Sequence, residues 1–409
     1  MRVGVLAHSF PRFPGDTHGP FVERLSEEIA HLGHEVHVLV PHDPKLVCDR
    51  PGPLTVHGFR YIVPESGHLL GYSRTLKRDR GLRLLAWLEA PLYFFFAERA
   101  LRRLVRRQRL ELLHAHWILP NGFVAARTAE AAGIPLAVTL HGSDVFMAEQ
   151  NALFGALARR ALAGAAHVTS CSPDLAERLA ALGDDADRNE IHLVPNGTDL
   201  PTSDPDPGAA RARFGLPSED RVILAVGRLV DKKGFRYLIE ALPAILETEP
   251  RARVVIGGGG ELGESLEELA DRLGVGERVT FTGALSHDEV LALMAAGDVF
   301  VMPSVRDDRG NVDGLPIVVL EAMAAARPVV ATDVAGLGLA VRPGVTGDLV
   351  PEKDPGALAT AIGSLLENPE RAREQGRAGR RRVERELNWA AIARRHDRLY
   401  HRAKERSDR

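Results

Sequence analysis

The chain has 409 residues, of which 45% are hydrophobic and 26% are charged, and its formal net charge is −3. This length and balance predict a soluble globular protein of two domains, and the small net charge excludes a global field that would draw the chain to nucleic acid. Cys48 and Cys171 are the only cysteines and lie far apart in the sequence, so we expect no disulfide framework and no thiolate metal site. This cysteine content is compatible with a protein of the reducing cytoplasm.

The first 40 residues predict a strand–helix–strand unit. Residues 2–7 form an apolar strand, residues 21–32 a helix that ends at Gly33, and residues 35–40 a second strand. Such a unit implies a parallel sheet with a ligand site at the carboxyl ends of its strands. The loop before the helix contains Gly15, Thr17 and Gly19 and is longer than a turn requires. It either faces a ligand or is a flexible loop that uses glycine for tight bends.

Contact with a membrane is one interpretation of residues 87–109. The segment from Trp87 to Phe96 is apolar and aromatic, and arginines then repeat at helical spacing opposite apolar residues. These arginines are Arg99, Arg102, Arg103, Arg106 and Arg107. The helix could lie on an anionic membrane and meet a lipid-linked acceptor, or it could be an ordinary helix with a solvated arginine face. The chain starts with too few apolar residues for a signal peptide and has no membrane-spanning run, so we expect it not to cross a membrane.

Histidines mark the ends of two further predicted strands. Residues 112–117 form a strand that carries His114 and His116 on one face, but no carboxylate or cysteine nearby completes a metal-ligand set, so we predict no metal. His141 follows the strand at residues 135–140 and therefore points into an α/β cleft or caps a loop. Strands at residues 167–172 and 191–194 follow, and a turn with Asn196, Gly197 and Asp199 ends this half.

A proline-rich linker at residues 200–217, partly helical near residues 209–214, separates a second α/β half. We expect a strand at residues 221–226, a loop with Arg228 and Lys233, and a helix to about residue 246. Later strands are predicted at 253–256, 279–282 and 299–302, with 329–332 as the last clear strand, and the chain is helical after residue 355.

The glycines at 258, 260 and 263 formally match a dinucleotide-binding fingerprint. The acid that should end the next strand is absent, since the chain has Phe281-Thr-Gly283 there, which argues against an NAD enzyme. The glycines are better explained by a close approach of backbone to a nucleotide or to a packed helix.

Two acids bracket the start of an apolar helix at residues 317–326. Asp313 precedes the expected free N–H groups, and Glu321 lies about two turns inside the helix. Gly314 marks a turn, and Pro316 suits the first helical position. A helix N-terminus binds anions and flanking carboxylates accept hydroxyl hydrogen bonds, so the segment suits a nucleotide sugar. An N-capping Asp with an ion-paired Glu is the alternative.

The motif Asp313-Gly-Leu-Pro-x4-Glu321 resembles the acid-x7-Glu motif of the retaining, two-domain (GT-B type) glycosyltransferases of family 4. The segments His141-Gly-Ser-Asp, Gly227-Arg-x5-Lys-Gly and Pro195-Asn-Gly-Thr-Asp also resemble family segments and follow in family order. Asp313 departs from the usual Glu by one methylene group.

The resemblance implies two Rossmann-like doubly wound domains that face a cleft. Residues 1–200 would form the acceptor-side domain, residues 201–388 the donor-binding domain, and residues 389–409 a final helix that packs back on the first domain. The family implies the following site, listed by role: Arg228, Lys233 and the amides near Gly314 and Leu315 on the donor diphosphate; Glu321 on the ribose; Asp313 on sugar hydroxyls; His141 beside the reacting sugar; Asn196 at the cleft; Gly15, Thr17 and Gly19 near donor phosphate and acceptor. The base of the donor nucleotide would lie between Gly260 and Gly283.

The expected activity is transfer of a hexose from a UDP- or GDP-sugar to a hydroxyl acceptor, without a cofactor or metal. The acceptor could be lipid-linked or a growing surface glycan, with the enzyme in the cytoplasm or on the inner face of the membrane. A nucleotide-sugar epimerase of the same architecture and a non-catalytic nucleotide-sugar-binding protein remain as alternatives.

Overall fold

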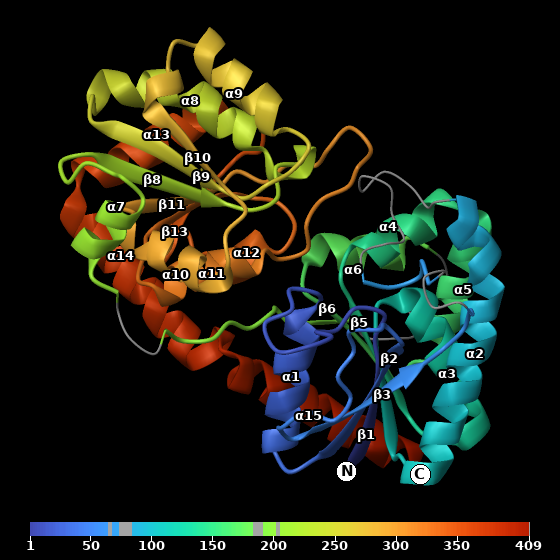
Figure 1. Cartoon of the computed structure of the whole chain (residues 1–409). Helices are drawn as coiled ribbons and strands as arrows, with labels where there is room; N and C mark the ends of the chain where they lie inside the picture. Colours follow the sequence, from blue (N-terminus) through green and yellow to red (C-terminus); the bar gives the residue numbers. More distant parts are fainter. Residues whose placement is uncertain (64–67, 73–83, 183–190, 202–204, 409) are drawn as a thin grey trace. The chain divides into compact units, whose positions relative to one another are not determined.

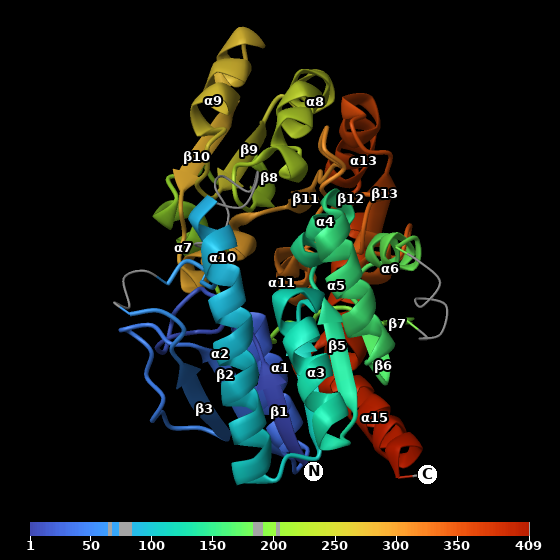
Figure 2. The same cartoon turned by 90° about the vertical axis from the view of Figure 1, so that its right-hand side faces the viewer.

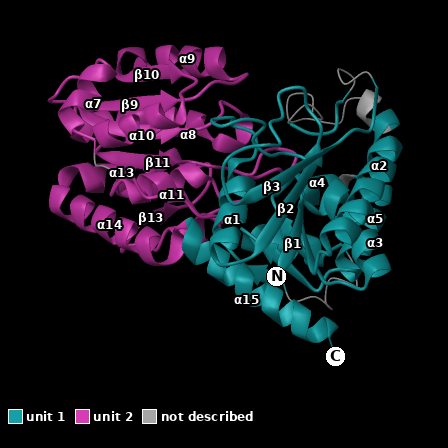
Figure 3. Ribbon diagram, turned by 60° about the horizontal axis from the view of Figure 1, so that its bottom comes forward, with its two compact units in different colours: residues 1–194, 389–409 teal, residues 195–388 magenta. Residues whose placement is uncertain are grey.

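A computed structural model describes residues 1–63, 68–72, 84–182, 191–201 and 205–408, without the side chains of residues 84–87 and 150. The chain divides into two compact units (Figure 3). Unit 1 contains Met1–Val194 and Trp389–Arg409, and unit 2 contains Pro195–Asn388. Part of the expected linker, at residues 202–204, lies outside the described residues.

Unit 1 is built on a parallel sheet of order β3-β2-β1-β4-β5-β6-β7 (Figure 1). The strands are β1 (Arg2–Leu6), β2 (Glu35–Pro41), β3 (Leu54–Phe59), β4 (Leu112–His116), β5 (Leu136–Leu140), β6 (His167–Ser170) and β7 (Ile191–Leu193). Val3 pairs with Val36 on one side and with Leu112 on the other. The central strands are apolar on both faces because helices cover both faces of a parallel sheet.

The helices of unit 1 pack in two groups, α1 with α15 and α3 with α2 and α5. They are α1 (Pro20–His31), α2 (Leu84–Gln108), α3 (Phe123–Ala132), α4 (Ser143–Gln150), α5 (Ala152–Ala163), α6 (Pro173–Ala180) and α15 (Trp389–Ser407), with a π-helical turn, η2 (Ile118–Gly122), before α3. Helix α15 packs on α1, and α3 packs on both α2 and α5, which stand together on the near side in Figure 2. The Tyr400 hydroxyl meets His114 Nδ1 at 2.7 Å in the core. The final helix therefore returns to the first domain, as predicted.

Unit 2 is built on a second parallel sheet of order β10-β9-β8-β11-β12-β13. The strands are β8 (Arg221–Val226), β9 (Ala252–Gly257), β10 (Val279–Gly283), β11 (Val299–Met302), β12 (Val329–Thr332) and β13 (Gly347–Val350). The helices are α7 (Pro207–Arg213), α8 (Phe235–Thr248), α9 (Gly263–Arg272), α10 (His287–Ala296), α11 (Ile317–Ala324), α12 (Leu337–Ala340), α13 (Pro355–Glu367) and α14 (Pro369–Arg382), with short turns η4 (Asp231–Lys233), η5 (Gly276–Arg278) and η6 (Val383–Leu387). One side of the core joins β8 and β9 to α8 and α13, with Leu238, Leu242 and Ile362 fully buried.

The structure differs from the sequence predictions in three respects. β3 was missed and β13 follows the strand expected to be the last; both are edge strands, and β13 begins with Gly347 and Asp348, which are rare in strands. Pro316 has extended backbone (φ −63°, ψ 119°) and precedes α11 instead of occupying its first position. The division between the units falls after Val194, so Asn196, Gly197 and Asp199 belong to unit 2, where the amide of Thr198 donates to the Leu387 carbonyl.

Candidate functional site

The carboxyl edge of the unit 2 sheet carries a compact group of charges. β8 and β11 are neighbours in the sheet, so the loops that follow them lie close together. Lys232 and Lys233 lie in η4 after β8, and Asp313 lies in the loop after β11. Lys232 Nζ is 3.0 Å from Asp313 Oδ1, and Lys233 Nζ is 2.7 Å from Asp313 Oδ2. We call these three residues the lysine–aspartate cluster.

The lysine–aspartate cluster is largely shielded from solvent. The side chains of Lys232, Lys233 and Asp313 are 15%, 12% and 17% exposed. Burial alone would raise the pKa of Asp313, but the two ammonium groups outweigh it, Lys233 first, and hold this pKa below its ordinary value. The carboxylate is therefore charged, and the cluster keeps a net charge of about +1. Lys232 was not among the predicted site residues, because two adjacent lysines in a loop resemble ordinary surface charge.

Backbone contacts between two loops make the glycines of the β9–α9 connection necessary. A Cβ atom on Gly258 would lie 1.9 Å from the Gly227 carbonyl oxygen, and one on Gly260 would lie 2.4 Å from the Leu229 carbonyl oxygen. The amide of Leu229 donates to the Gly259 carbonyl at 3.0 Å. The glycines therefore support the loop that carries Arg228, which is itself exposed. Gly283 ends β10, is exposed, has φ +71°, and accepts a hydrogen bond from the Gly258 amide.

Glu321 points toward groups that sequence reasoning did not connect with it. Its carboxylate Oε1 is 3.5 Å from His287 Nδ1 at the start of α10, and its side chain is 14% exposed. Burial raises the pKa of Glu321, the nearby His287 opposes this rise, and the negative charge of Asp199 adds to it. The carboxylate oxygens of Glu321 can accept a hydrogen bond from a hydroxyl group.

The segment between Asp313 and Glu321 is held by hydrogen bonds to two of its backbone carbonyls. The Asn196 side-chain amide donates to the Leu315 carbonyl at 3.2 Å, and the Gly336 amide donates to the Gly314 carbonyl at 2.8 Å. Asn196 therefore positions the loop between Asp313 and α11.

His141 lies in unit 1, directly after β5, in an aromatic environment. Its ring is 4.5 Å from the Trp117 ring and 4.9 Å from the Phe21 ring between centroids. His141 Nε2 and His116 Nδ1 are 3.0 Å apart, so one of them donates a hydrogen bond to the other. Burial, aided by the nearby histidines, lowers the pKa of His141 to about 3. The imidazole is therefore neutral at physiological pH.

Asp144 shapes the loop that presents His141, a role that sequence analysis did not assign. This fully buried carboxylate accepts hydrogen bonds from the amides of Ile118 (2.7 Å) and Gly142 (2.9 Å), and the His141 amide points at it from 3.3 Å. The Asp of the His-Gly-x-Asp segment is thus a backbone clamp between the ends of β4 and β5.

The loop before α1 holds Gly15, Thr17 and Gly19. Gly15 and Gly19 have positive φ angles (+84° and +64°), and a Cβ atom on Gly19 would lie 2.6 Å from the Ser9 carbonyl oxygen. Gly19 precedes α1, whose second residue, Phe21, contacts the His141 ring. Thr17 is exposed.

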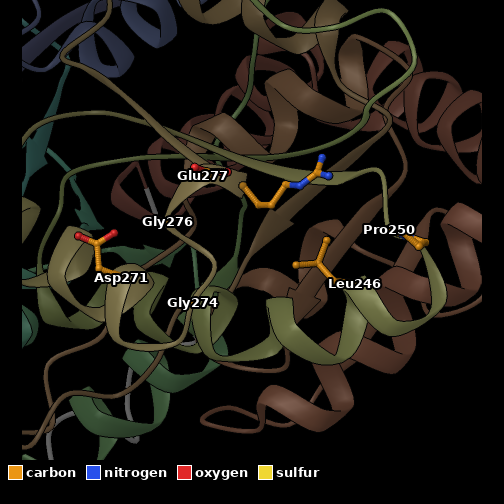
Figure 4. A pocket seen from close by; sticks show the side chains of 7 residues that line it. Leu246, Pro250, Asp271, Gly274, Gly276 and Glu277 are labelled. Atoms are coloured by element: carbon orange, nitrogen blue, oxygen red, sulfur yellow. The ribbon is translucent and has the colours of Figure 1, made fainter.

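A separate pocket of about 530 Å³ lies in unit 2 (Figure 4). Its lining comes from the end of α8, the end of α9 and η5, and comprises Leu246, Pro250, Asp271, Gly274, Gly276, Glu277 and Arg278. These segments precede β9 and β10, so the pocket is at the amino edge of the sheet and contains none of the predicted site residues.

Comparison with known proteins defines the class to which this fold and site belong. The family described as Glycosyl transferases group 1 matches residues 208–382, and the Glycosyl transferase 4-like domain matches residues 17–197. The chain is 34% identical to the GDP-mannose-dependent alpha-(1-6)-phosphatidylinositol monomannoside mannosyltransferase of Mycobacterium tuberculosis, over 72% of this chain and 76% of the relative. It is 33% identical to the D-inositol 3-phosphate glycosyltransferase of Nocardia farcinica, over 92% of this chain and 84% of the relative.

Solved structures show the same two-domain GT-B architecture. Sucrose-phosphate synthase from Thermosynechococcus elongatus has a TM-score of 0.78 at 25% identity, with 98% of both chains covered. Anabaena HepE in complex with UDP-glucose has a TM-score of 0.69 at 21% identity, with 97% of this chain and 98% of HepE covered. The protein is a glycosyltransferase. The chain belongs to the Glycosyl transferases group 1 family, the family 4 type that its motifs resemble.

Proposed function

We propose that this glycosyltransferase is a retaining enzyme that moves a hexose-type sugar from a UDP- or GDP-sugar to a hydroxyl acceptor without a metal ion. The observation that carries the proposal is the lysine–aspartate cluster at the carboxyl edge of the unit 2 sheet. Two largely shielded ammonium groups beside the start of α11 can neutralise a diphosphate, which is the task that a divalent ion performs in other enzymes.

The proposed donor site extends along the segment from Asp313 to Glu321. Arg228, Lys233 and the amides of Gly314 and Leu315 hold the diphosphate, and Glu321 accepts a hydrogen bond from the ribose. Asp313 accepts a hydrogen bond from a sugar hydroxyl. When the diphosphate arrives, one lysine turns from Asp313 to a phosphate oxygen, and the carboxylate is then available to the sugar.

In the proposed reaction the acceptor oxygen attacks the anomeric carbon from the face that the diphosphate leaves. The new carbon–oxygen bond forms as the bond to the phosphate oxygen breaks, and that oxygen takes the acceptor proton. No protein base is needed. His141 is neutral, so its role is to hydrogen-bond the reacting sugar and not to transfer a proton.

The donor panel that tests this function should contain UDP- and GDP-sugars, each assayed with and without EDTA. We expect release of a nucleoside diphosphate that rises with a hydroxyl acceptor and does not change with EDTA. The anomeric configuration of the product, read by NMR, should equal that of the donor. An inverted product, or activity that EDTA abolishes and Mg²⁺ or Mn²⁺ restores, would contradict the proposed mechanism.

A lipid-linked acceptor is the second part of the proposal, and it rests on α2. Large apolar side chains on one side of this helix face solvent: Leu88 (70% exposed), Phe95 (61%), Leu92 (43%) and Phe96 (36%). Arg99, Arg103, Arg106 and Arg107 are also exposed and follow on the same helix. Among the described residues, no helix is long and apolar enough to span a bilayer. An apolar stripe followed by arginines suits a helix that lies on an anionic surface, which is why we place the enzyme at the inner face of the membrane.

Cosedimentation with vesicles tests this contact. The wild type should pellet with phosphatidylserine vesicles at low salt, and the Arg103→Glu/Arg107→Glu variant should lose most of this binding, since each arginine contributes about 1 kcal/mol. Arg102 is a poor target because it pairs with Glu98 at 2.6 Å. The matched control is Arg373→Glu/Arg377→Glu, two exposed arginines on α14 with the same charge change. If the wild type stays in the supernatant, or if both variants bind equally, the α2 arginines are a solvated face.

A further inference from the structure

Three potential metal ligands converge at the amino edge of the unit 1 sheet. They are His34, directly before β2, and Asp397 and His401 on α15. His34 Nε2 is 2.9 Å from Asp397 Oδ1, and His401 Nε2 is 3.3 Å from the same oxygen. All three ligand atoms lie within 4.8 Å of one another. Asp397 and His401 are four residues apart, so they project from one face of the helix.

Two of the three separations come close to those that a tetrahedral ion requires. Bonds of about 2.0–2.2 Å to imidazole nitrogen and carboxylate oxygen place neighbouring ligand atoms of a tetrahedral ion about 3.3–3.6 Å apart. The separation of 2.9 Å must widen by about half an ångström and the separation of 3.3 Å by at most about 0.3 Å, which side-chain rotation can supply. The third separation, between the two imidazole nitrogens, has an upper limit of 4.8 Å.

The burial of the three groups favours an ion with one open position. The His34 side chain is 5% exposed, Asp397 is 25% exposed, and His401 is 61% exposed. His34 is therefore fixed by packing, and solvent reaches the site from the His401 side and can supply a fourth ligand. Two imidazoles and one carboxylate select a transition metal over Mg²⁺ or Ca²⁺, which prefer oxygen ligands.

We propose that His34, Asp397 and His401 form a binding site for Zn²⁺ or a chemically similar divalent transition metal. The site is separate from the proposed catalysis, because His34 lies at the amino edge of the sheet and His141 follows the carboxyl end of β5. Its effect is structural. The ion joins the loop between α1 and β2 to α15, the helix that returns from unit 2 and packs on α1 (Figure 1).

Metal titration of the full chain, prepared without a histidine tag and treated with EDTA, tests the site. Calorimetry should show one saturable Zn²⁺ site, and Co²⁺ should give the visible absorption of a four- or five-coordinate ion. His401→Ala and Asp397→Asn should each weaken Zn²⁺ binding by at least about 100-fold. Each removes a direct ligand, and loss of an outer-shell partner alone already costs up to about 100-fold. His401 is exposed, so its substitution should leave the fold intact, as circular dichroism would verify.

His31→Ala is the matched control, because His31 is an exposed histidine at the end of α1 beside Glu28 and outside the cluster. It should bind Zn²⁺ like the wild type. Saturating Zn²⁺ should raise Tm of the wild type and of His31→Ala by about 2 °C or more and leave Tm of His401→Ala unchanged. Glycosyl transfer should be the same in His401→Ala as in the wild type. Unchanged Zn²⁺ affinity in His401→Ala, equal loss in His31→Ala, or no saturable site in the wild type would overturn the proposal.

Discussion

Asp313→Ala should lower kcat/KM by about 30- to 1,000-fold, or about 2–4 kcal/mol, if the carboxylate's hydrogen bond to the sugar tightens in the transition state. Affinity for the free nucleoside diphosphate should be kept or should rise, because Lys232 and Lys233 lose the carboxylate that neutralises them. Lys233→Ala should do the opposite and weaken diphosphate binding itself. Calorimetry with the free diphosphate and kinetics with the intact donor provide the two measurements.

Asp313→Glu is the informative control for the comparison of Asp313→Ala with Lys233→Ala. It keeps the charge opposite the lysines and restores the acid that is usual in the family, so it tests whether the shorter side chain suits a particular sugar. Wild-type turnover in Asp313→Ala would show that the sugar is held elsewhere. Loss of diphosphate binding as severe as in Lys233→Ala would show that Asp313 serves only to position the lysines.

Gly258→Ala should destabilise unit 2 by about 3 kcal/mol or more. The new Cβ atom would lie 1.9 Å from the Gly227 carbonyl oxygen, and φ at this position is +137°. Overpacking and backbone strain each cost about 1–3 kcal/mol, and neither loop can move without disturbing the other. The displaced Gly227–Leu229 segment should also weaken donor binding, since Arg228 lies within it.

The sequence offers a way to assign the unfolding of Gly258→Ala to unit 2. All three tryptophans, Trp87, Trp117 and Trp389, lie in unit 1, so their fluorescence follows that unit, whereas far-ultraviolet circular dichroism follows both. In urea, the variant should lose part of its circular dichroism signal early while tryptophan fluorescence changes as in the wild type. Gly263→Ala is the matched control, because its Cβ atom would lie an ordinary 3.5 Å from Leu229 Cδ1 at the start of α9. Identical urea curves for Gly258→Ala and the wild type would refute the packing argument.

Much of the fold could be predicted because its central strands are short apolar runs bounded by glycine or polar residues. The runs at 112–117 and 299–302 correspond closely to β4 and β11. β3 and β13 were missed because an edge strand needs fewer apolar residues: β3 contains Thr55, His57 and Gly58. The family and the two-sheet architecture are confirmed by the relatives and the solved structures.

The candidate site could be predicted by residue but not by contact. The motifs predict Lys233 on a phosphate and Asp313 on a sugar, and the structure joins the two in one ion-paired cluster that also includes Lys232. The contact of Glu321 with His287 and the clamp formed by Asp144 were not predicted either. Each of these contacts joins residues from different loops or helices, and residue spacing along the chain does not specify which segments meet at a sheet edge. The roles assigned to individual site residues remain predictions.

Unit 1 is built from two separate stretches of the chain, and this has a consequence for its synthesis on the ribosome. Unit 2 is one continuous stretch, so it can fold once residue 388 has emerged. Unit 1 begins first, yet its buried His114 has no Tyr400 hydroxyl to pair with until α15 has been made. During translation, the first unit to start is therefore the last to complete its core, and its sheet stays incompletely covered while almost two hundred intervening residues are added. Truncation within α15 should for this reason impair unit 1 and leave unit 2 folded.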